Sequence, residues 1–179
     1  MPILFSVHGP YDVPAYKGKA GRTITDADVA KFWAKNPSLA EKRGCYIFGI
    51  KAGRGYTPAY AGMATKKFKG EAFAHHKLTR YQQFLADVVR GKPVMFFLVA
   101  PHKRGAPNSK HIGQLEDFLI QAGVAANPKS FLNIQGTKVE EWGIAGVLRG
   151  GQGKRSKDAK EFIRIMKILP VHSISKCVP

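Results

Sequence analysis

Apolar and polar positions change their period several times along the chain, and these changes predict an alternation of strands and helices. Residues 44–50 and 57–62 are short apolar runs separated by a glycine-containing segment, which predicts a hairpin. A helix is expected at about 71–90, and the apolar run 93–100 predicts a further buried strand.

Other helices are expected from their capping residues and their apolar stripes. The first has its apolar stripe at Val29, Phe32 and Trp33. For the rings of Phe32, Trp33 and Trp142, core packing is favoured over base stacking. The capping candidates are Thr25 or Asp26 for the first helix, Asn108 or Ser109 for a second that ends at Gly123, and Ser156 for a last basic helix at about 157–168.

This order of elements predicts an α/β (α+β) fold, with a small, mostly antiparallel three-stranded sheet flanked by helices. The length suits one domain over residues 1–179. Within it we expect a core at about 43–135, an N-terminal extension at 1–42 and a basic C-terminal extension at 136–179.

Charge changes this picture from a plain globular domain to a candidate polyanion-binding protein. The chain has 29 Lys and Arg against 12 Asp and Glu, a formal net charge of +17. Such an excess favours nucleic acid as the partner, whereas a basic amphipathic helix for a membrane surface is not evident. The two cysteines lack metal-ligand spacing, and no signal peptide is evident, so a reducing, cytoplasmic location is expected.

Two tyrosines lie in the predicted hairpin, close in sequence to a block of lysines. Tyr46 and Tyr60 occupy neighbouring strands, and Lys66, Lys67 and Lys69 follow directly. Two phenols beside several ammonium groups indicate a site for an anion.

The helix at 71–90 has a lysine in the middle of its apolar face. Lys77 lies there on the helical wheel, with His76 and Arg80 on the near margin, four residues apart. Lys77 could extend its ammonium to the rim of the face or direct it at a bound phosphate, and both interpretations stay open.

The helix at 108–123 has a carboxylate on its apolar face. Glu116 falls between Ile112 and Ile120 on the apolar stripe, where an unpaired charge is unfavourable. A salt bridge to a lysine and a divalent metal site are the two interpretations. Mg²⁺ is commonly held by one or two carboxylates, with water and phosphate completing its shell.

The stretches GCY (44–46) and YAG (60–62), the basic helix after them and LEDFLIQAG…LN (115–133) together resemble the GIY-YIG nuclease family over roughly residues 43–135. The resemblance implies metal-dependent hydrolysis of DNA with Mg²⁺ or Mn²⁺. It implies that Tyr46 acts as general base or orients the attacking water, that Tyr60 assists it, and that Glu116 holds the metal. Asn133 matches the asparagine that often follows the glutamate.

The chain departs from the family pattern at its cations. The family arginine on the helix is missing, and Met63 replaces the family lysine. Lys66, Lys69 or Lys77 could supply the charge, without the bidentate fork of arginine. Some members use a histidine on this helix, for which His76 is the candidate. Further nucleic-acid contacts are expected from these residues: Lys66, Lys67, Lys69, Arg80, Asn133, Arg149, Lys154 and Arg155.

Two alternatives remain beside the DNA endonuclease. One is a catalytically impaired nucleic-acid-binding module of the same fold. The other is a small basic RNA-binding protein, for which salt-sensitive binding without metal-dependent cleavage would be typical. The sequence does not indicate an oligomeric state.

Overall fold

The computed structural model describes residues 3–18, 21–88, 90–101, 109–133 and 156–158. The chain divides into two compact units, Met1–Lys138 and Val139–Pro179. In the second unit, Lys157 and Asp158 are helical after Ser156, within the helix expected there. The rest of that helix lies outside the described residues, as do Trp142, Arg149, Lys154 and Arg155.

The first unit is built on an antiparallel sheet, which confirms the α+β prediction. Its strand order is β1–β6–β4–β5, and a separate two-stranded sheet pairs β2 with β3. The strands are β1 (Ser6–Asp12), β2 (Tyr16–Gly18), β3 (Gly21–Thr23), β4 (Gly44–Ala52), β5 (Gly55–Ala64) and β6 (Lys92–Val99). The predicted hairpin is β4–β5, with Tyr46 directly opposite Gly62.

The main sheet has four strands and not the expected three, because β1 from the N-terminal extension pairs with β6. The sequence of β1, SVHGPYD, contains a glycine and a proline, which argue against a strand. The strand tolerates them because it is an edge strand, and its register shifts between His8 and Tyr11.

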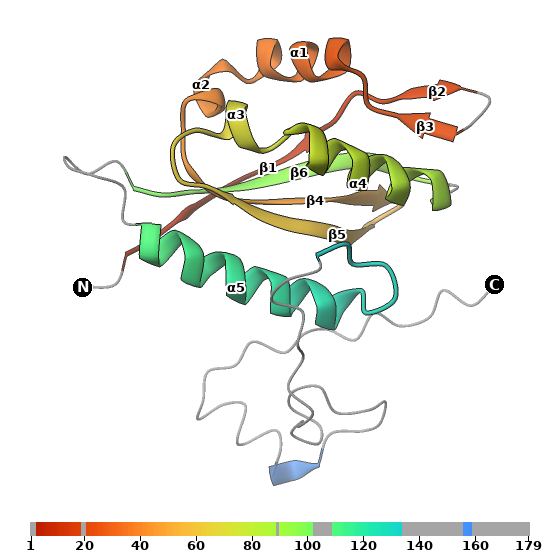
Figure 1. Cartoon of the computed structure of the whole chain (residues 1–179). Helices are drawn as coiled ribbons and strands as arrows, with labels where there is room; N and C mark the ends of the chain where they lie inside the picture. The colour runs from red at the N-terminus through yellow and green to blue at the C-terminus, as the bar shows by residue number, and fades with distance from the viewer. Residues whose placement is uncertain (1–2, 19–20, 89, 102–108, 134–155, 159–179) are drawn as a thin grey trace. The chain divides into compact units, whose positions relative to one another are not determined.

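Helices cover both faces of the sheet (Figure 1). The helices are α1 (Asp26–Lys35), α2 (Pro37–Ala40), α3 (Phe68–Glu71), α4 (His75–Asp87) and α5 (Ser109–Ala126). Figure 1 shows α1, α3 and α4 on one face and α5 on the other. Thr25 caps α1 through a reciprocal capping box with Asp28, which confirms the predicted start.

Two helix boundaries differ from the prediction. The segment expected as one helix at 71–90 forms α3 and α4, separated by Ala72–Ala74, and α4 ends at Asp87. Helix α5 continues past Gly123 to Ala126. Gly123 provides space for the ring of Phe131, which a Cβ would meet at 2.2 Å, so this glycine serves packing and does not end the helix.

Alternation along β4 assigns its side chains to the two faces. Tyr46 and Phe48 face the α4 side, where Phe48 stacks on Tyr81 with ring centroids 4.2 Å apart. Cys45 faces α5, and its thiol donates to the carbonyl of Ile112. Phe32 and Trp33 are buried in the core on the α4 side, which confirms their predicted packing role.

Candidate functional site

The two predicted tyrosines meet on β4 and β5, the edge pair of the main sheet. The rings of Tyr46 and Tyr60 are nearly parallel, with centroids 6.5 Å apart. Tyr46 lies over Gly62, because a Cβ on Gly62 would be 2.5 Å from the Tyr46 hydroxyl oxygen. The glycine of YAG thus leaves the space that the phenol fills, and any larger residue would displace the hydroxyl.

The hydroxyl of Tyr46 is buried. Its polar neighbour is the Tyr81 hydroxyl, although no hydrogen bond of ordinary geometry joins the two in the described structure. The side chain is 0% exposed. Burial raises the pKa of Tyr46 strongly, and the neighbouring Tyr81, Tyr60 and Glu116 raise it further. The phenol is therefore protonated at neutral pH, so the expected neighbouring cations do not make it a phenolate in the isolated protein.

Lys77 on α4 is close to this phenol. Its side chain is only 7% exposed, and its ammonium lies 5.3 Å from the centroid of the Tyr46 ring. Glu71 of α3 pairs with the ammonium at 3.2 Å. The Lys77 ammonium thus pairs with a half-exposed carboxylate, and a phosphate-binding role for it stays a prediction.

Glu116 reaches the same region from α5. Partial burial raises the pKa of its carboxyl, an effect that Lys77 and a hydrogen bond from the Met63 backbone oppose. Within the described residues Glu116 makes no salt bridge, since the ion pairs there are Lys67–Glu41 and Lys77–Glu71. The predicted salt bridge to a lysine is thus not found in that part of the chain, and Glu116 is a half-buried carboxylate on which the Lys77 charge acts without forming an ion pair.

The outer edge of β5 explains how residues from both faces of the sheet converge. The backbone N–H of Leu132 donates to the carbonyl of Ala59, and the amide of Asn133 makes two hydrogen bonds with Ala61, at 2.9 and 2.8 Å. The next outward N–H, that of Met63, is the one that donates to Glu116. The 132–133 segment and Glu116 thus follow each other along this edge.

Asn133 therefore has a structural partner where a nucleic-acid contact was predicted, because both functional atoms of its amide are bonded to β5. Arg80 supports the same segment by donating to the carbonyl of Leu132 at 3.0 Å. Its guanidinium also lowers the pKa of Tyr60, although burial, the largest effect, leaves that pKa raised.

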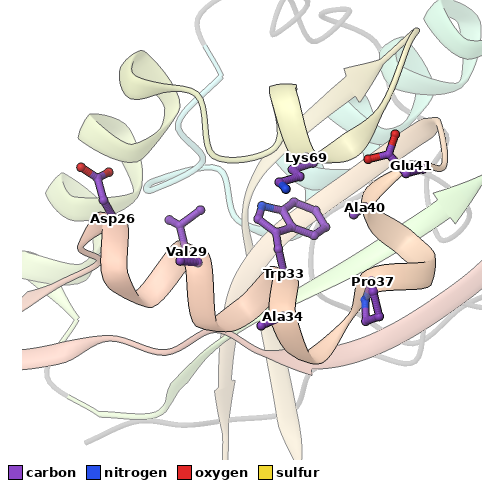
Figure 2. A pocket seen from close by; sticks show the side chains of 9 residues that line it. Asp26, Val29, Trp33, Ala34, Pro37, Ala40, Glu41 and Lys69 are labelled. Carbon is purple, nitrogen blue, oxygen red and sulfur yellow. The ribbon is translucent and has the colours of Figure 1, made fainter.

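Four other residues predicted from sequence are exposed. His76 is exposed on α4, and Lys66 is exposed after β5. Lys67 pairs with Glu41 at 3.6 Å, with both side chains exposed. Lys69 lines an open hollow of about 580 Å³ beside Trp33 and Glu41 (Figure 2). Tyr46, Tyr60, Lys77 and Glu116 are not among the residues that line this hollow.

Sequence reasoning missed Glu71 and Tyr81 as members of the site. Glu71 precedes Lys77 by six residues across a break between helices, so helical spacing could not pair them. Tyr81 belongs to the apolar face of α4. It is buried there, and its hydroxyl donates to the carbonyl of Ala72 at 2.9 Å. The position of Tyr81 four residues after Lys77 was the available signal.

The described residues contain no group of three or more His, Cys, Asp or Glu side chains that could hold a metal ion by themselves. A single carboxylate suits Mg²⁺ or Mn²⁺ only where water and substrate phosphate supply the other ligands. The lack of a paired cation at Glu116 fits that arrangement.

Comparisons with models of known protein families, with curated proteins and with solved structures gave no match. In the described part of the chain, no helix has the length and apolar character needed to cross a bilayer.

Proposed function

We propose that the protein is a divalent-metal-dependent DNA endonuclease related to the GIY-YIG nucleases. The observation that carries the proposal is the buried hydroxyl of Tyr46, which makes no hydrogen bond of ordinary geometry in the described structure, beside the Lys77 ammonium and close to the Glu116 carboxylate, which has no ion pair there. A buried polar group without a partner is unfavourable for folding, so its retention is expected where a ligand completes the hydrogen bond.

Glu116 would hold Mg²⁺ or Mn²⁺ through its carboxylate oxygens. When bound, the ion would stabilise negative charge that develops on the phosphoryl oxygens. The raised pKa of Glu116 reflects a partly desolvated carboxylate, which gains more from a nearby cation than an exposed one does.

Lys77 is our candidate for the cation that replaces the family arginine. It is the charged side chain buried against Tyr46, whereas Lys66 and Lys69 are exposed. Glu71 is a positioning residue, because its ion pair fixes the ammonium next to the phenol ring. An ammonium offers a point charge and not a bidentate fork, which suits attraction of one phosphate oxygen.

Tyr46 then orients the attacking water through a neutral hydroxyl, a role that requires substrate binding to open access to a side chain that is 0% exposed in the structure. Its pKa is raised, the direction opposite to that required of a general base at neutral pH. The base role also inferred from the resemblance would require the pKa to fall when a metal and a phosphate-bound water are present. Tyr60, with Arg80 nearby, completes the polar side of the site.

The competing function is a nucleic-acid-binding module without catalysis. The raised pKa of Tyr46 and the lack of the family arginine in the sequence after Tyr60 favour this alternative. The buried Lys77 argues against it, since contacts that only grip a nucleic-acid backbone are made by exposed cations without burial of a lysine in the core.

Cleavage of supercoiled plasmid DNA with Mg²⁺, with Mn²⁺ and with EDTA tests the proposal. We expect metal-dependent nicking by the wild type, and its loss in Glu116→Ala and Tyr46→Phe while DNA binding is retained. Lys77→Gln should also lose nicking, and Lys69→Gln is the matched control that should keep it. Binding without cleavage in either metal, or full activity of Glu116→Ala, would select the binding module.

A further inference from the structure

The tip of the β4–β5 hairpin carries a second cationic surface, on the other side of the strands from the Tyr46 phenol. Lys51 of β4 lies directly opposite Lys92 of β6 in the strand register. Two like charges facing each other across a strand pair are destabilising unless an anion lies between or above them. Gly91, with a φ of 99°, allows the backbone before β6 to approach the backbone of Lys51. A Cβ at this position would meet the Lys51 carbonyl oxygen at 2.7 Å.

An exposed aromatic ring accompanies this lysine pair. Tyr56 of β5 is opposite Lys51 in the register and is 42% exposed. The Lys51 ammonium is 5.8 Å from the centroid of its ring, and the Phe96 ring supports it edge-on at 5.5 Å. Tyr56 thus has a fixed orientation and still presents part of its ring to the solvent.

The cations around the tip are not neutralised within the described structure. Arg54 and Arg90 are also exposed there, in the hairpin turn and just before Gly91. In the described residues neither arginine, nor Lys51 nor Lys92, forms a salt bridge. A group of positive charges around an exposed, rigid aromatic ring combines backbone attraction with base stacking, the two features of single-strand recognition.

We propose that Tyr56, Lys51 and Lys92 form a docking surface for an unpaired stretch of the DNA substrate. Tyr56 stacks on a base and the two ammonium groups bind its flanking phosphates. Lys51 follows Tyr46 by five residues on β4, which places the surface roughly 17 Å along the strand from the phenol. A strand held here would extend from the cleavage position, and single-stranded or distorted DNA would bind more tightly than a regular duplex. The inference takes DNA as its ligand from the proposed function.

Equilibrium binding of a short fluorescent single-stranded DNA oligonucleotide of mixed sequence, in EDTA, tests this surface without cleavage. We expect Tyr56→Leu to bind about tenfold more weakly and Tyr56→Phe to bind like the wild type, because stacking requires only the ring. Lys51→Gln combined with Lys92→Gln should weaken binding and reduce the salt slope by about 1.4. Lys31→Gln combined with Lys110→Gln removes the same charge from exposed positions on α1 and α5, as the control.

The surface is refuted if Tyr56→Leu retains wild-type affinity, or if the two double variants weaken binding equally. It is also refuted if the Tyr56 and Lys51–Lys92 variants weaken duplex DNA or RNA as much as single-stranded DNA. Thermal unfolding of each variant identifies any loss of folding, and Tyr56→Phe remains informative if Tyr56→Leu is unstable. If the variants show these binding differences but the wild type does not nick plasmid, the proposed nuclease function is overturned and the docking surface stands.

Discussion

At the scale of single residues, we expect the hydroxyl of Tyr46 to be required for nicking but not for the stability of the fold. Its removal in Tyr46→Phe deletes a buried polar group that makes no hydrogen bond of ordinary geometry, so the free energy of unfolding should stay equal or rise by about 1 kcal/mol. Nicking should be lost. In the matched variant Tyr81→Phe, loss of the hydrogen bond to Ala72 should lower the free energy of unfolding by about 1 kcal/mol.

Urea denaturation monitored by circular dichroism measures both changes. Equal destabilisation by the two variants would show that the Tyr46 hydroxyl has a structural partner in the folded protein. Nicking by Tyr46→Phe at the wild-type rate would remove the hydroxyl from the mechanism.

Glu116 gives a second prediction at this scale, through the pH dependence of stability. Its folded pKa is raised, so folding disfavours the carboxylate, and the penalty is present above the folded pKa and disappears as pH falls below the unfolded value of 4.5. Glu116→Gln should therefore be more stable than the wild type at pH 7, with the difference vanishing near pH 4.

Metal provides the control for this pH experiment. At pH 7, Mg²⁺ or Mn²⁺ should raise the melting temperature of the wild type and leave that of Glu116→Gln unchanged, since the ion binds only the folded carboxylate. A variant less stable than the wild type at pH 7, or an equal shift with metal, would contradict the assignment of Glu116.

At the scale of elements, the β5 edge depends on the 132–133 segment. Asn133→Ala removes both amide hydrogen bonds to Ala61, so we expect a loss of about 1–3 kcal/mol in the free energy of unfolding. Asn133→Asp keeps the acceptor for the Ala61 N–H, but its second carboxylate oxygen replaces the donor and faces the Ala61 carbonyl oxygen, so it should lose at least as much. Urea denaturation measures the loss, and the DNA affinity of Asn133→Ala should be unchanged in conditions where this variant is folded. Weaker DNA binding with an unchanged unfolding midpoint would restore the nucleic-acid role predicted from sequence.

The elements also show which parts of the fold the sequence can predict. Apolar periodicity located β4, β5, β6, α1 and α5, and the Thr25 cap was predicted because capping is a local interaction. Residues 1–22 could be interpreted from sequence only as strand or loop, because the pairing of β1 with β6 is non-local and Gly9 and Pro10 obscure its pattern. Periodicity also placed Lys77 and Glu116 on buried faces, whereas the pair with Glu71 depends on the break between α3 and α4.

At the scale of the whole molecule, the net charge of +17 sets how DNA affinity responds to salt. Only phosphates contacted by unpaired cations release counterions, so the slope of log affinity against log salt counts contacts and not total charge.

Lys66 and Lys67 are adjacent and both exposed, but Glu41 balances the charge of Lys67. Lys66→Gln should therefore reduce the slope for duplex DNA by about 0.9, the value for one phosphate contact, and Lys67→Gln by less. Titrations of labelled duplex at several salt concentrations in EDTA give both slopes. Equal reductions would show that the Glu41 pair opens on binding, and no reduction by Lys66→Gln would place the DNA path away from the segment after β5.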